Sequence, residues 1–562
     1  MATKKKKKKK GGGLARALAS TSRSREQSPL RPKHVEKKPP CRATCPSGNR
    51  IREFVMKIAM AERVGMSPDQ AMEEAWHIYT DTSPFPAVCG RVCPAPCESE
   101  CNRKELEGPV NINKLERAIG DFGVEKGLKL KVLSEEKKPQ KIAVIGAGPS
   151  GLSAAYQLAR RGYGVTVLES MLKPGGMLRY GIPGYRLPES VLDAEIQRIL
   201  DLGVELKCGV KVGKDVNLDE LRGSYDAVYV ALGAQQGVRL GVEGEDAPNV
   251  FSGVDFLNRF HHGERLEIGK DVVVAIVGGG DTAIDAARIC KRLGANVTIL
   301  YRRTRTEMPA IDSEIDEALE EGIQIEFLAA PIGFKKEGDR VTAMRCIRME
   351  LGEPDDSGRR RPVPIEGSEF EIPASAVISA ISQAPDFTGF EPLTEGKRWI
   401  SVDDQGATVV EGCWAGGDVT QLDLVTTAVG HGRRAAEAIE RNFFGTAPEK
   451  DEMPVIRTDK MRLDHYEVAE RIKAPTLSVE ERLAAIDIEV SKGLDRDLVV
   501  AQARRCMSCG YCFDCEKCWL FCQDQAVNKP MQKGVLYTFK MENCTGCKKC
   551  AEECPCGFIE MH

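Results

Sequence analysis

Apolar and polar positions alternate with different periods in different regions of the chain. Between residues 136 and 450, short apolar runs alternate with stretches of helical period, which predicts strands and helices in βαβ order. Two of these runs lead directly into a glycine-rich turn. In residues 51–58 the apolar positions share one helical face, and we expect residues 36–135 to be helical. Residues 451–505 are charged, have little β character and predict a helical connector.

Cysteine is the most informative part of the composition. The chain has 21 cysteines among 562 residues, and 17 of them fall in two groups, at 41–101 and 506–556. A disulfide framework is typical of small secreted chains, whereas no apolar leader opens this sequence and a large nucleotide-binding region separates the two groups. We therefore expect metal ligation in a reducing cytoplasm.

Charge and hydropathy narrow the range of partners. The formal net charge is −3 at pH 7, so the chain lacks the basic balance of a nucleic-acid-binding protein. No apolar run approaches the ~18 residues that a transmembrane helix needs. Residues 1–35 are basic, with Lys4–Lys10 in one run, and we expect a disordered arm there. A transit peptide and a tether for an acidic partner are the alternatives.

The first glycine-rich turn has the full context of a dinucleotide-binding fingerprint. An apolar strand at 141–145 runs into Gly146-Ala-Gly148-Pro-Ser-Gly151, a helical stretch follows, and the next strand ends at Glu169. In such a turn a pyrophosphate lies against the second glycine at the helix N-terminus, and the acidic residue accepts hydrogen bonds from a ribose diol. A packing turn without a ligand is the alternative.

Later segments favour FAD at this first turn. A loop rich in glycine and proline at 174–188 suits an extended cofactor, and Asp418 after an apolar strand can hold a ribityl chain or a phosphate. The helix that opens at Val425 offers free N–H groups that can stabilise negative charge on a reduced flavin. The candidate FAD-binding residues are Gly146, Gly148, Ser150, Gly151, Glu169, Gly176, Leu178, Arg186, Gly417, Asp418, Thr427 and Ala428.

The second glycine-rich turn predicts a nicotinamide-dinucleotide site. It matches the fingerprint with alanine in the third position, and the following strand ends in Arg302 and Arg303 instead of an acidic residue. Two guanidiniums at this point favour the 2′-phosphate of NADPH over NADH, and a solvated strand end is the alternative. Hydride transfer needs no acid–base side chain, so we name no catalytic residue. The candidate residues are Gly278, Gly280, Asp281, Thr282, Ala283, Arg302 and Arg303.

Two cysteine runs near residue 562 follow the spacing of bacterial two-cluster ferredoxins. Each run has the form Cys-x2-Cys-x2-Cys-x3-Cys, and in that pattern the fourth cysteine of one run binds the cluster of the other. Gln523 replaces the proline usual after the first run. Zinc is the alternative, although zinc sites rarely repeat this spacing. We assign one [4Fe–4S] cluster to Cys512, Cys515, Cys518 and Cys554, and the other to Cys544, Cys547, Cys550 and Cys522.

Four motifs make residues 36–450 resemble the small subunit of glutamate synthase. They are residues 85–101, Gly108-Pro-Val-Asn111, residues 176–183 and Tyr301-Arg-Arg303. The region is also similar to the N-terminal half of dihydropyrimidine dehydrogenase and to the large subunit of NADPH-dependent ferredoxin:NAD oxidoreductases. The resemblance implies two N-terminal clusters. The first would be held by Cys45, Cys93, Cys97 and Glu116.

For the second N-terminal cluster, the resemblance implies Cys41, Cys101 and an upstream cysteine pair that this sequence lacks. The matching segment lies near the other end, at Cys506-Met-Ser-Cys509. We therefore hypothesise that Cys506 and Cys509 complete this cluster, within one chain or across a dimer. Loss of the cluster, with Cys41 and Cys101 as relics, is the alternative, so we expect three to four [4Fe–4S] clusters.

The order of these parts predicts an oxidoreductase that moves electrons from NAD(P)H through FAD and [4Fe–4S] clusters to an acceptor, or in reverse. The acceptor is expected to be a ferredoxin or a larger redox enzyme. Proteins with this appended module resemble accessory subunits of 2-oxoacid:ferredoxin, aromatic-reduction or sulfur-metabolism enzymes. The alternatives are the small subunit of glutamate synthase and a non-catalytic relay or assembly subunit. A homodimer and a hetero-oligomer both stay open.

We expect a multidomain α/β fold in which the NAD(P)H-binding domain interrupts the FAD-binding domain. Both nucleotide domains are expected to be Rossmann-like. The expected domains are a disordered basic arm at 1–35, an α-helical iron–sulfur domain at 36–135, an FAD-binding domain at 136–250 and 375–450, an NAD(P)H-binding domain at 251–374, a helical connector at 451–505, and a bacterial ferredoxin-like α+β domain at 506–562.

Overall fold

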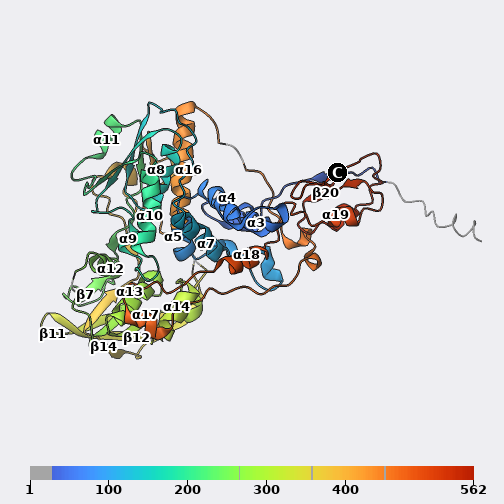
Figure 1. Ribbon diagram of the computed structural model, residues 1–562. Coiled ribbons are helices and arrows are strands. Elements are labelled where there is room, and N and C mark those ends of the chain that lie inside the picture. The colour runs from blue at the N-terminus through green and yellow to red at the C-terminus, as the bar shows by residue number, and fades with distance from the viewer. Residues whose placement is uncertain (1–27, 265, 356–357, 449–450) are drawn as a thin grey trace, which may run out of the picture.

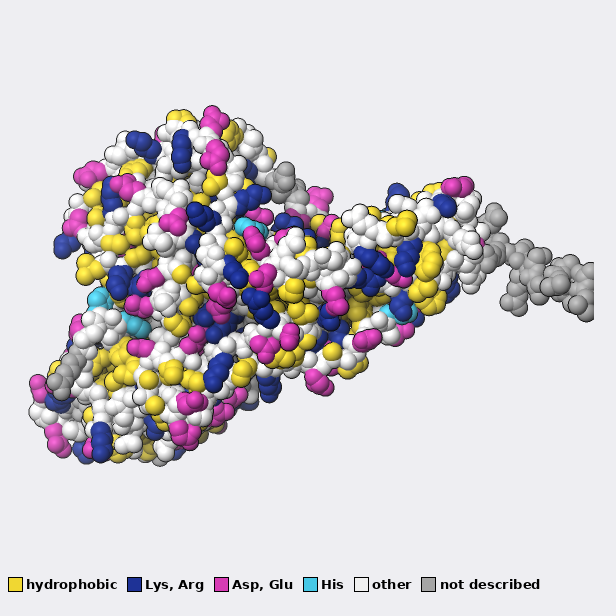
Figure 2. All heavy atoms as spheres, in the orientation of Figure 1, with side chains coloured by type: hydrophobic (Ala, Val, Ile, Leu, Met, Phe, Trp, Pro, Cys, Tyr) yellow, Lys and Arg dark blue, Asp and Glu magenta, His cyan; other side chains and the backbone are white. Residues whose placement is uncertain are grey.

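The computed structural model describes residues 28–264, 266–355, 358–448 and 451–562. No helix in these ranges is both long and apolar enough to cross a membrane. Figure 1 shows three lobes: one holds α8 and α16, a second holds α13 and β12, and a narrow third holds α19 and β20. Basic and acidic side chains are interspersed on the face shown in Figure 2, in keeping with the net charge of −3.

Residues 40–125 are helical, as the apolar periodicity predicts. Ser67 and Asn111 cap two of the helices, because each side-chain oxygen accepts a hydrogen bond from a backbone N–H of the first turn. The apolar faces, with Phe54 and Trp76 among their residues, meet in one buried core. The helices are α2 (Pro40–Thr44), α3 (Ile51–Met60), α4 (Pro68–Thr80), α5 (Pro86–Val92), α6 (Pro96–Ser99) and α7 (Ile112–Glu125), with the short turns η1 (Glu62–Val64) and η2 (Asn102–Glu105).

Helices α5 and α7 cross so closely that each has a glycine at the contact. A Cβ atom on Gly90 of α5 would lie 2.2 Å from the backbone nitrogen of Arg117. A Cβ atom on Gly120 of α7 would lie 2.2 Å from the backbone nitrogen of Ala87. Because no side chain fits such a gap, the crossing fixes α7 against the helix that leads into Cys93.

Two parallel sheets follow, the arrangement that alternating strands and helices predict. The first has the strand order β17-β5-β2-β3-β4 and the second β10-β9-β8-β15-β7. Helices cover them, so the central strands are buried on both faces. The first lobe contains β2 (Lys141–Ile145), α8 (Pro149–Ala159), β3 (Gly164–Glu169), α9 (Met177–Tyr180), α10 (Glu189–Leu200), β4 (Glu205–Cys208), α11 (Leu218–Ser224), β5 (Ala227–Val230), α15 (Glu391–Thr394), β17 (Cys413–Ala415) and α16 (Val425–Phe444).

The second lobe adds an antiparallel sheet to its parallel one. The two segments that join the lobes also pair with each other, as the short antiparallel strands β6 (Gln236–Gly237) and β16 (Gln383–Ala384). The second lobe contains β7 (Val250–Ser252), α12 (Gly253–His261), β8 (Val273–Val277), α13 (Asp281–Arg292), β9 (Asn296–Tyr301), η3 (Arg305–Glu307), α14 (Asp312–Glu320), β10 (Gln324–Phe327), β11 (Ala329–Glu337), β12 (Arg340–Pro354), β13 (Arg360–Pro364), β14 (Phe370–Pro373) and β15 (Ala376–Ser379).

Strand β15 belongs to the second sheet, which corrects the expected domain boundary at residue 375. It pairs in parallel with β8 and with β7, and all four of its residues are buried. An apolar run indicates a buried strand, but both parallel sheets impose the same pattern, so the pattern does not reveal which sheet the strand joins. The chain returns to the first lobe only after Ser379.

The two ends of the described chain pair with each other in the third lobe. Strand β1 runs antiparallel to β20, with Pro32 opposite Met561. Residues 28–35 are thus part of the fold, which corrects the disordered arm expected over 1–35; residues 1–27 lie outside the described part. Composition does not record a backbone partner so distant in sequence. The elements are β1 (Pro32–His34), α19 (Lys517–Leu520), β18 (Val527–Asn528), β19 (Thr538–Phe539), α20 (Lys549–Glu552) and β20 (Ile559–Met561).

The connector at 451–505 mostly lacks regular secondary structure, which corrects the expected helical connector. Its charged residues pair with the domains along which it runs: Arg471 pairs with Glu98 and Arg482 with Glu320. The high charge therefore serves ion pairs between lobes and does not mark a solvated helical face. Its helical turns are η4 (Thr458–Lys460), η5 (Leu463–His465), α17 (Val479–Ala484) and α18 (Arg496–Ala503).

We expect Gly120→Ala to destabilise the fold by about 1–3 kcal/mol, because the new methyl group has to push α5 away from α7. Gly223→Ala is the matched control, since a Cβ atom at Gly223 would meet no atom within 4 Å. Thermal unfolding followed by circular dichroism measures the difference. Equal unfolding midpoints for the two variants would contradict the tight crossing.

Candidate functional site

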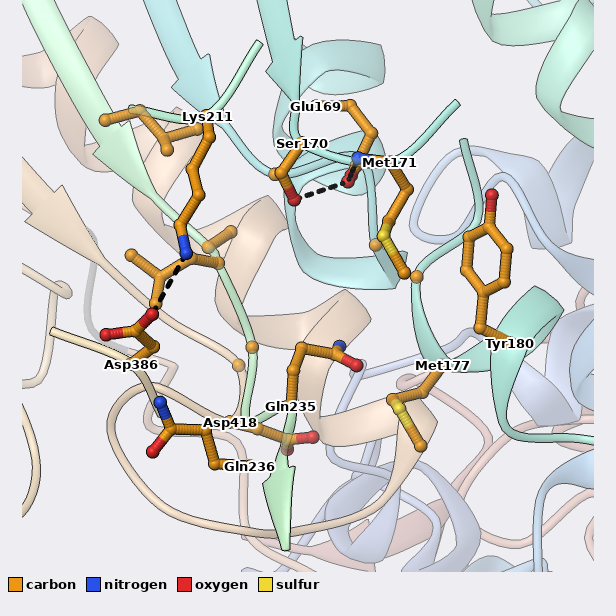
Figure 3. A pocket seen from close by; sticks show the side chains of 18 of the residues that line it. Glu169, Ser170, Met171, Met177, Tyr180, Lys211, Gln235, Gln236, Asp386 and Asp418 are labelled. Atoms are coloured by element: carbon orange, nitrogen blue, oxygen red, sulfur yellow. Dashed lines mark hydrogen bonds and ion pairs between the residues drawn. The ribbon is translucent and has the colours of Figure 1, made fainter. Parts of the chain in front are cut away.

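A cavity of about 640 Å³ opens at the carboxyl edge of the first sheet, where parallel α/β folds bind their ligands. The turn after β2, the end of β3, the loop before α9 and the start of α16 supply its walls. In Figure 3, Glu169 lies on one side of the cavity, and Gln235 and Asp418 lie on the other. The candidate FAD-binding residues in the lining are Gly146, Gly148, Ser150, Glu169, Gly176, Gly417, Asp418 and Ala428.

The middle glycine of each fingerprint faces open space. A Cβ atom on Gly148 would meet only Gly176, 4.0 Å away, and one on Gly280 would meet only Pro309, 3.9 Å away. Protein packing therefore requires neither glycine, whereas the close approach of a pyrophosphate requires both. Each is also the N-cap of a helix, α8 or α13, with no side chain bonded to the first free N–H groups. Both turns thus fit a dinucleotide.

Glu169 closes one end of the first cavity. Its carboxylate accepts hydrogen bonds from the backbone nitrogen of Ala147 at 2.7 Å and from that of Met171 at 2.8 Å. These bonds fix the side chain at the end of β3. Oε1 also accepts a hydrogen bond from the Ser170 hydroxyl at 3.2 Å, whereas Oε2 accepts only the bond from Ala147 and keeps a lone pair for a ribose hydroxyl.

Asp418 and the first turn of α16 form the opposite end. Burial raises the pKa of Asp418 to about 6. The N–H of Gly417 donates to Nδ1 of His431 at 3.0 Å, which makes that ring nitrogen an acceptor. Among the described residues the hydroxyl of Thr427 has no hydrogen-bond partner, although it is buried beside Ala428. A buried hydroxyl without a partner fits a polar ligand at this helix terminus.

Besides Thr427, three candidate FAD residues lie outside this lining. Leu178 belongs to the hydrophobic core. Arg186 forms a buried ion pair with Asp285 of α13, 2.8 Å apart, and so joins the two nucleotide lobes. Gly151 lets α8 pack on β2, since a Cβ atom there would lie 1.9 Å from the carbonyl oxygen of Gly146. Their positions support structural roles around the cavity.

A second cavity, of about 520 Å³, opens at the corresponding edge of the second sheet. Asp281 is turned away and accepts a hydrogen bond from the backbone of Ile311 at 3.1 Å, and Ala283 is buried in the core. The hydroxyl of Ser379, in the lining, has no partner within the ranges that the structure describes. The candidate residues in the lining are Gly278, Gly280, Thr282, Arg302 and Arg303.

The two arginines after β9 have different surroundings. Arg303 is buried, pairs with Asp355 at 2.6 Å and donates to the carbonyl of Arg360 at 2.7 Å. Arg302 is exposed and lines the cavity. Partial desolvation of its guanidinium, and then the positive charge of Arg303, lower its pKa. Arg302 is therefore the guanidinium placed to bind a phosphate, while Arg303 holds the neighbouring loop.

The two cavities meet at the start of α12. Ser252 lines the first cavity, Gly253 lines the second, and Val254 lines both. Ligands of the two cavities would therefore share one wall. Two redox cofactors that exchange a hydride need such contact.

Cys45, Cys93, Cys97 and Glu116 lie close together in the helical domain. Burial, and then the Glu116 carboxylate, raises the pKa of all three thiols. Burial, and then Glu98, raises the pKa of Glu116 itself to about 8. Groups that disfavour one another's negative charge in this way fit a site where a cationic metal centre offsets the repulsion.

The loop after Cys45 is pressed against α16. Ser47 donates a hydrogen bond to the carbonyl of Thr426 at 2.7 Å. A Cβ atom on Gly430 would lie 2.3 Å from the carbonyl oxygen of Pro46. The first cysteine group is thus adjacent to the helix whose first turn lines the cavity proposed for FAD.

The cysteines of the third lobe form two groups. Burial and then the thiols of its own group raise the pKa of Cys518 in one group and, to about 12, the pKa of Cys550 in the other. Each group combines three cysteines of one run with the fourth of the other run, the crossover known from two-cluster ferredoxins. The groups are Cys512, Cys515, Cys518 and Cys554, and Cys544, Cys547, Cys550 and Cys522.

A fourth group combines the two ends of one chain. Cys41, Cys101, Cys506 and Cys509 line a single small cavity. Nowhere in the described ranges do three His, Cys, Asp or Glu side chains converge closely enough for a single metal ion. A [4Fe–4S] cluster binds each cysteine through a different iron, so its thiols surround a space and do not meet at one point.

Comparisons with known proteins agree with this architecture. A family model described as pyridine nucleotide-disulphide oxidoreductase matches residues 133–432. A model described as dihydropyrimidine dehydrogenase domain II, 4Fe-4S cluster, matches residues 33–128. FprA from Mycobacterium tuberculosis, solved in complex with NADPH, shares the fold with a TM-score of 0.50 at 21% identity, over 55% of this chain and 85% of that one.

Several relatives are more than one third identical. The NADPH-Fe(3+) oxidoreductase subunit beta of Geobacter sulfurreducens is 37% identical over 84% of this chain and 75% of its own length. The NADP(+)-dependent formate dehydrogenase subunit beta of Moorella thermoacetica is 38% identical over 84% and 70%. The glutamate synthase [NADPH] small chain of Escherichia coli is 36% identical over 71% and 88%.

One residue that sequence reasoning missed holds the first cysteine group in place. Glu195 of α10 is completely buried, and its two oxygens accept hydrogen bonds from the backbone nitrogens of Ala87 at 2.9 Å and Val88 at 3.0 Å. These are first-turn N–H groups of α5, so a carboxylate from another domain caps this helix. No local pattern links residue 195 to residue 87; only the fold reveals the contact.

We expect Glu195→Ala to destabilise the fold by about 1–3 kcal/mol, because two N–H groups of α5 would be left buried without acceptors. Glu195→Gln should lose less, since its carbonyl oxygen keeps one of the two bonds. Thermal unfolding and the iron content of anaerobically purified protein are the measurements, with the exposed Glu73→Gln as the control. A loss no larger in Glu195→Ala than in the control would refute the capping role.

Proposed function

The chain belongs to the pyridine nucleotide-disulphide oxidoreductase family, and from this premise we propose that it takes electrons from NADPH and passes them through FAD and [4Fe–4S] clusters to a larger partner enzyme. The observation that carries the proposal is the shared wall at Val254 between the two nucleotide cavities. The cysteine group behind α16 supports an outlet for electrons on the far side of the first cavity.

The residues of each site fit the group proposed for it. In the first cavity, Gly148 leaves space for a pyrophosphate. Beside the lining residue Ala428, Thr427 has a buried hydroxyl without a protein partner in the described chain. In the second cavity, Gly280 leaves the same space, and Arg302 is placed for a 2′-phosphate. When bound, FAD accepts two electrons as a hydride and releases them singly, and each cluster carries one.

The third lobe is the proposed exit. Cys547 is the most exposed of the grouped cysteines, so its group reaches the surface. Leu520 and Phe521 lie beside Cys522 of the same group with exposed fractions of 61% and 41%. Apolar side chains exposed beside a redox group favour a docking surface for a protein acceptor. A larger redox subunit is the acceptor we propose, and a free ferredoxin is its alternative.

The relatives support a role as one subunit of a larger enzyme, because their printed names describe beta subunits and a small chain. The two beta subunits match 84% of this chain, whereas the glutamate synthase small chain matches 71%. The additional coverage favours an acceptor other than the glutamate synthase large subunit.

Anaerobic mixing of the full-length holoprotein with NADPH tests the proposed function. We expect bleaching of the flavin absorbance, followed by reduction of benzyl viologen. The reason is that the proposed FAD accepts two electrons from NADPH and the proposed clusters release them one at a time. The partner is tested separately, with ferredoxin and with glutamine plus 2-oxoglutarate and a glutamate synthase large subunit. A flavin that stays oxidised in excess NADPH and in excess NADH would exclude the proposal.

The nucleotide preference depends on Arg302. We expect Arg302→Ala to raise the KM for NADPH about tenfold or more, because a charge-assisted bond to the 2′-phosphate contributes about 1.5–3 kcal/mol. The KM for NADH should change little, since NADH lacks that phosphate. Arg305→Ala, which removes a surface pair with Asp316, is the control. Equal increases for both nucleotides would contradict this role.

A further inference from the structure

Four free thiols surround a small cavity between the helical domain and the segment that follows α18. Two of them, Cys41 and Cys101, come from the N-terminal domain, and the other two, Cys506 and Cys509, come from the C-terminal segment. None of the four belongs to the other three cysteine groups. The rest of the wall is largely apolar and includes Ile51, Val55, Val110, Ile112 and Met507.

Three buried arginines hold the backbone around Cys509 against the N-terminal domain. Arg52 donates to the carbonyl of Cys509 at 3.0 Å, and Arg103 donates to the carbonyl of Arg505 at 3.1 Å. Arg505 in turn pairs with Glu107 at 3.0 Å. These contacts cross between segments about 400 residues apart in the sequence, so the C-terminal cysteine pair has one defined place beside the N-terminal pair.

The turn that ends at Cys509 has the same backbone feature as the ferredoxin-type turns. Ser508 has a φ of 48°, in the left-handed region that few residues other than glycine adopt. The equivalent positions in the first turns of the two ferredoxin-type runs are also left-handed, Asp514 at 56° and Gly546 at 73°. The Cys506–Cys509 turn therefore has the conformation of a cluster-binding turn, although it stands outside both runs.

The surroundings of the four thiols suit an iron–sulfur cluster better than free thiols. The side-chain amide of Asn102 donates a hydrogen bond to Sγ of Cys509 at 3.6 Å. Hydrogen bonds to ligand sulfurs are a regular feature of such sites. A single zinc ion would need ligand atoms at about 2.0–2.3 Å, and the described side chains form no such group.

We propose that Cys41, Cys101, Cys506 and Cys509 of a single chain hold one [4Fe–4S] cluster, so that this site is assembled from both ends of the polypeptide. The inference rests on the proposed function, because it adds a site to the electron route described there. In this proposal Cys41 and Cys101 are cluster ligands and not relics of a lost cluster, and the other two ligands lie within the same chain.

This site lies between the N-terminal group and the third lobe. The hydroxyl of Tyr466 donates to the carbonyl of Met507 at 2.8 Å, and its ring stacks on Phe513 with the ring centroids 5.7 Å apart. Met507 lies between the two C-terminal cysteines of the shared site, and Phe513 lies between the first two cysteines of the next group. The shared site thus connects the helical domain to the ferredoxin-type module.

Iron quantitation of full-length, anaerobically purified protein tests the proposal. Four clusters correspond to about 16 irons per chain. We expect Cys41→Ser/Cys101→Ser and Cys506→Ser/Cys509→Ser each to lose about four irons and the same electron paramagnetic resonance signal. The quadruple variant should lose no more than either pair, because all four residues serve one cluster. Cys208→Ser, in β4 and outside every group, is the control and should keep all its iron.

Two outcomes would overturn the proposal: full iron in Cys506→Ser/Cys509→Ser, or a loss of about eight irons in the quadruple variant. Bound FAD and the signals of the other clusters show that the variants are folded. Reduction of the flavin by NADPH in the wild type reports the proposed function separately, since neither cysteine pair lines a nucleotide cavity.

A second measurement needs no variant. In the iron-loaded wild-type protein, all four thiols should resist alkylation, and after chelation of the iron they should be labelled together, as read by mass spectrometry. Labelling of Cys506 and Cys509 in the iron-loaded protein, with Cys41 and Cys101 protected, would show that the C-terminal pair is not ligated.

Discussion

Two cysteine thiols from the N-terminal domain and two from the C-terminal segment line one largely apolar cavity. The fold therefore has to bring these two distant segments of the chain together. Strand β1 pairs with β20, and the ammonium group of Lys37 donates to the carbonyl of Gly557 at 2.5 Å, so both ends of the described chain lie in one lobe. About 400 residues separate Cys101 from Cys506, but the entropy cost of closing such a loop grows only with the logarithm of its length. The buried arginines offset that cost, and cluster binding would add to them, because binding to a site that exists only in the folded state stabilises that state.

The two nucleotide lobes are joined through short segments. The two-residue strands β6 and β16 pair where the chain passes between them. The buried ion pair of Arg186 with Asp285 adds a contact, together with the hydroxyl of Tyr185, which donates to the same carboxylate at 3.1 Å. Removing one partner of a buried pair leaves an uncompensated charge, so this contact strongly constrains how the lobes meet. The shared wall at Val254 therefore depends on residues that lie in neither nucleotide cavity.

Sequence alone could predict what local patterns determine. Both fingerprints place a strand, a turn and a helix within about 30 residues, so the ligand-binding carboxyl edge of each sheet was predictable from periodicity and glycine spacing. Three features depend on partners distant in the chain, which the pattern could not supply: the sheet that β15 joins, the irregular connector, and the pairing of β1 with β20. The same holds at the site. Arg302 and Arg303 are equivalent in the sequence, and the fold distinguishes them: Arg303 is buried and pairs with Asp355, whereas Arg302 is exposed.

Ligand type and spacing also do not decide by themselves which cysteines bind iron. Among the 17 clustered cysteines, the four groups leave out Cys89 and Cys556, although each is close in sequence to proposed ligands. Cys89 is completely enclosed in α5, where its carbonyl accepts a hydrogen bond from the side chain of Asn113 at 3.0 Å and so helps to hold that helix on α7. Cys556 has its sulfur 3.8 Å from that of Cys554, a distance at which one sulfur can donate a hydrogen bond to the other. With Cys554 bound to iron as a thiolate, as proposed, the S–H of Cys556 would be the donor, and donors to ligand sulfurs tune the potential of a cluster.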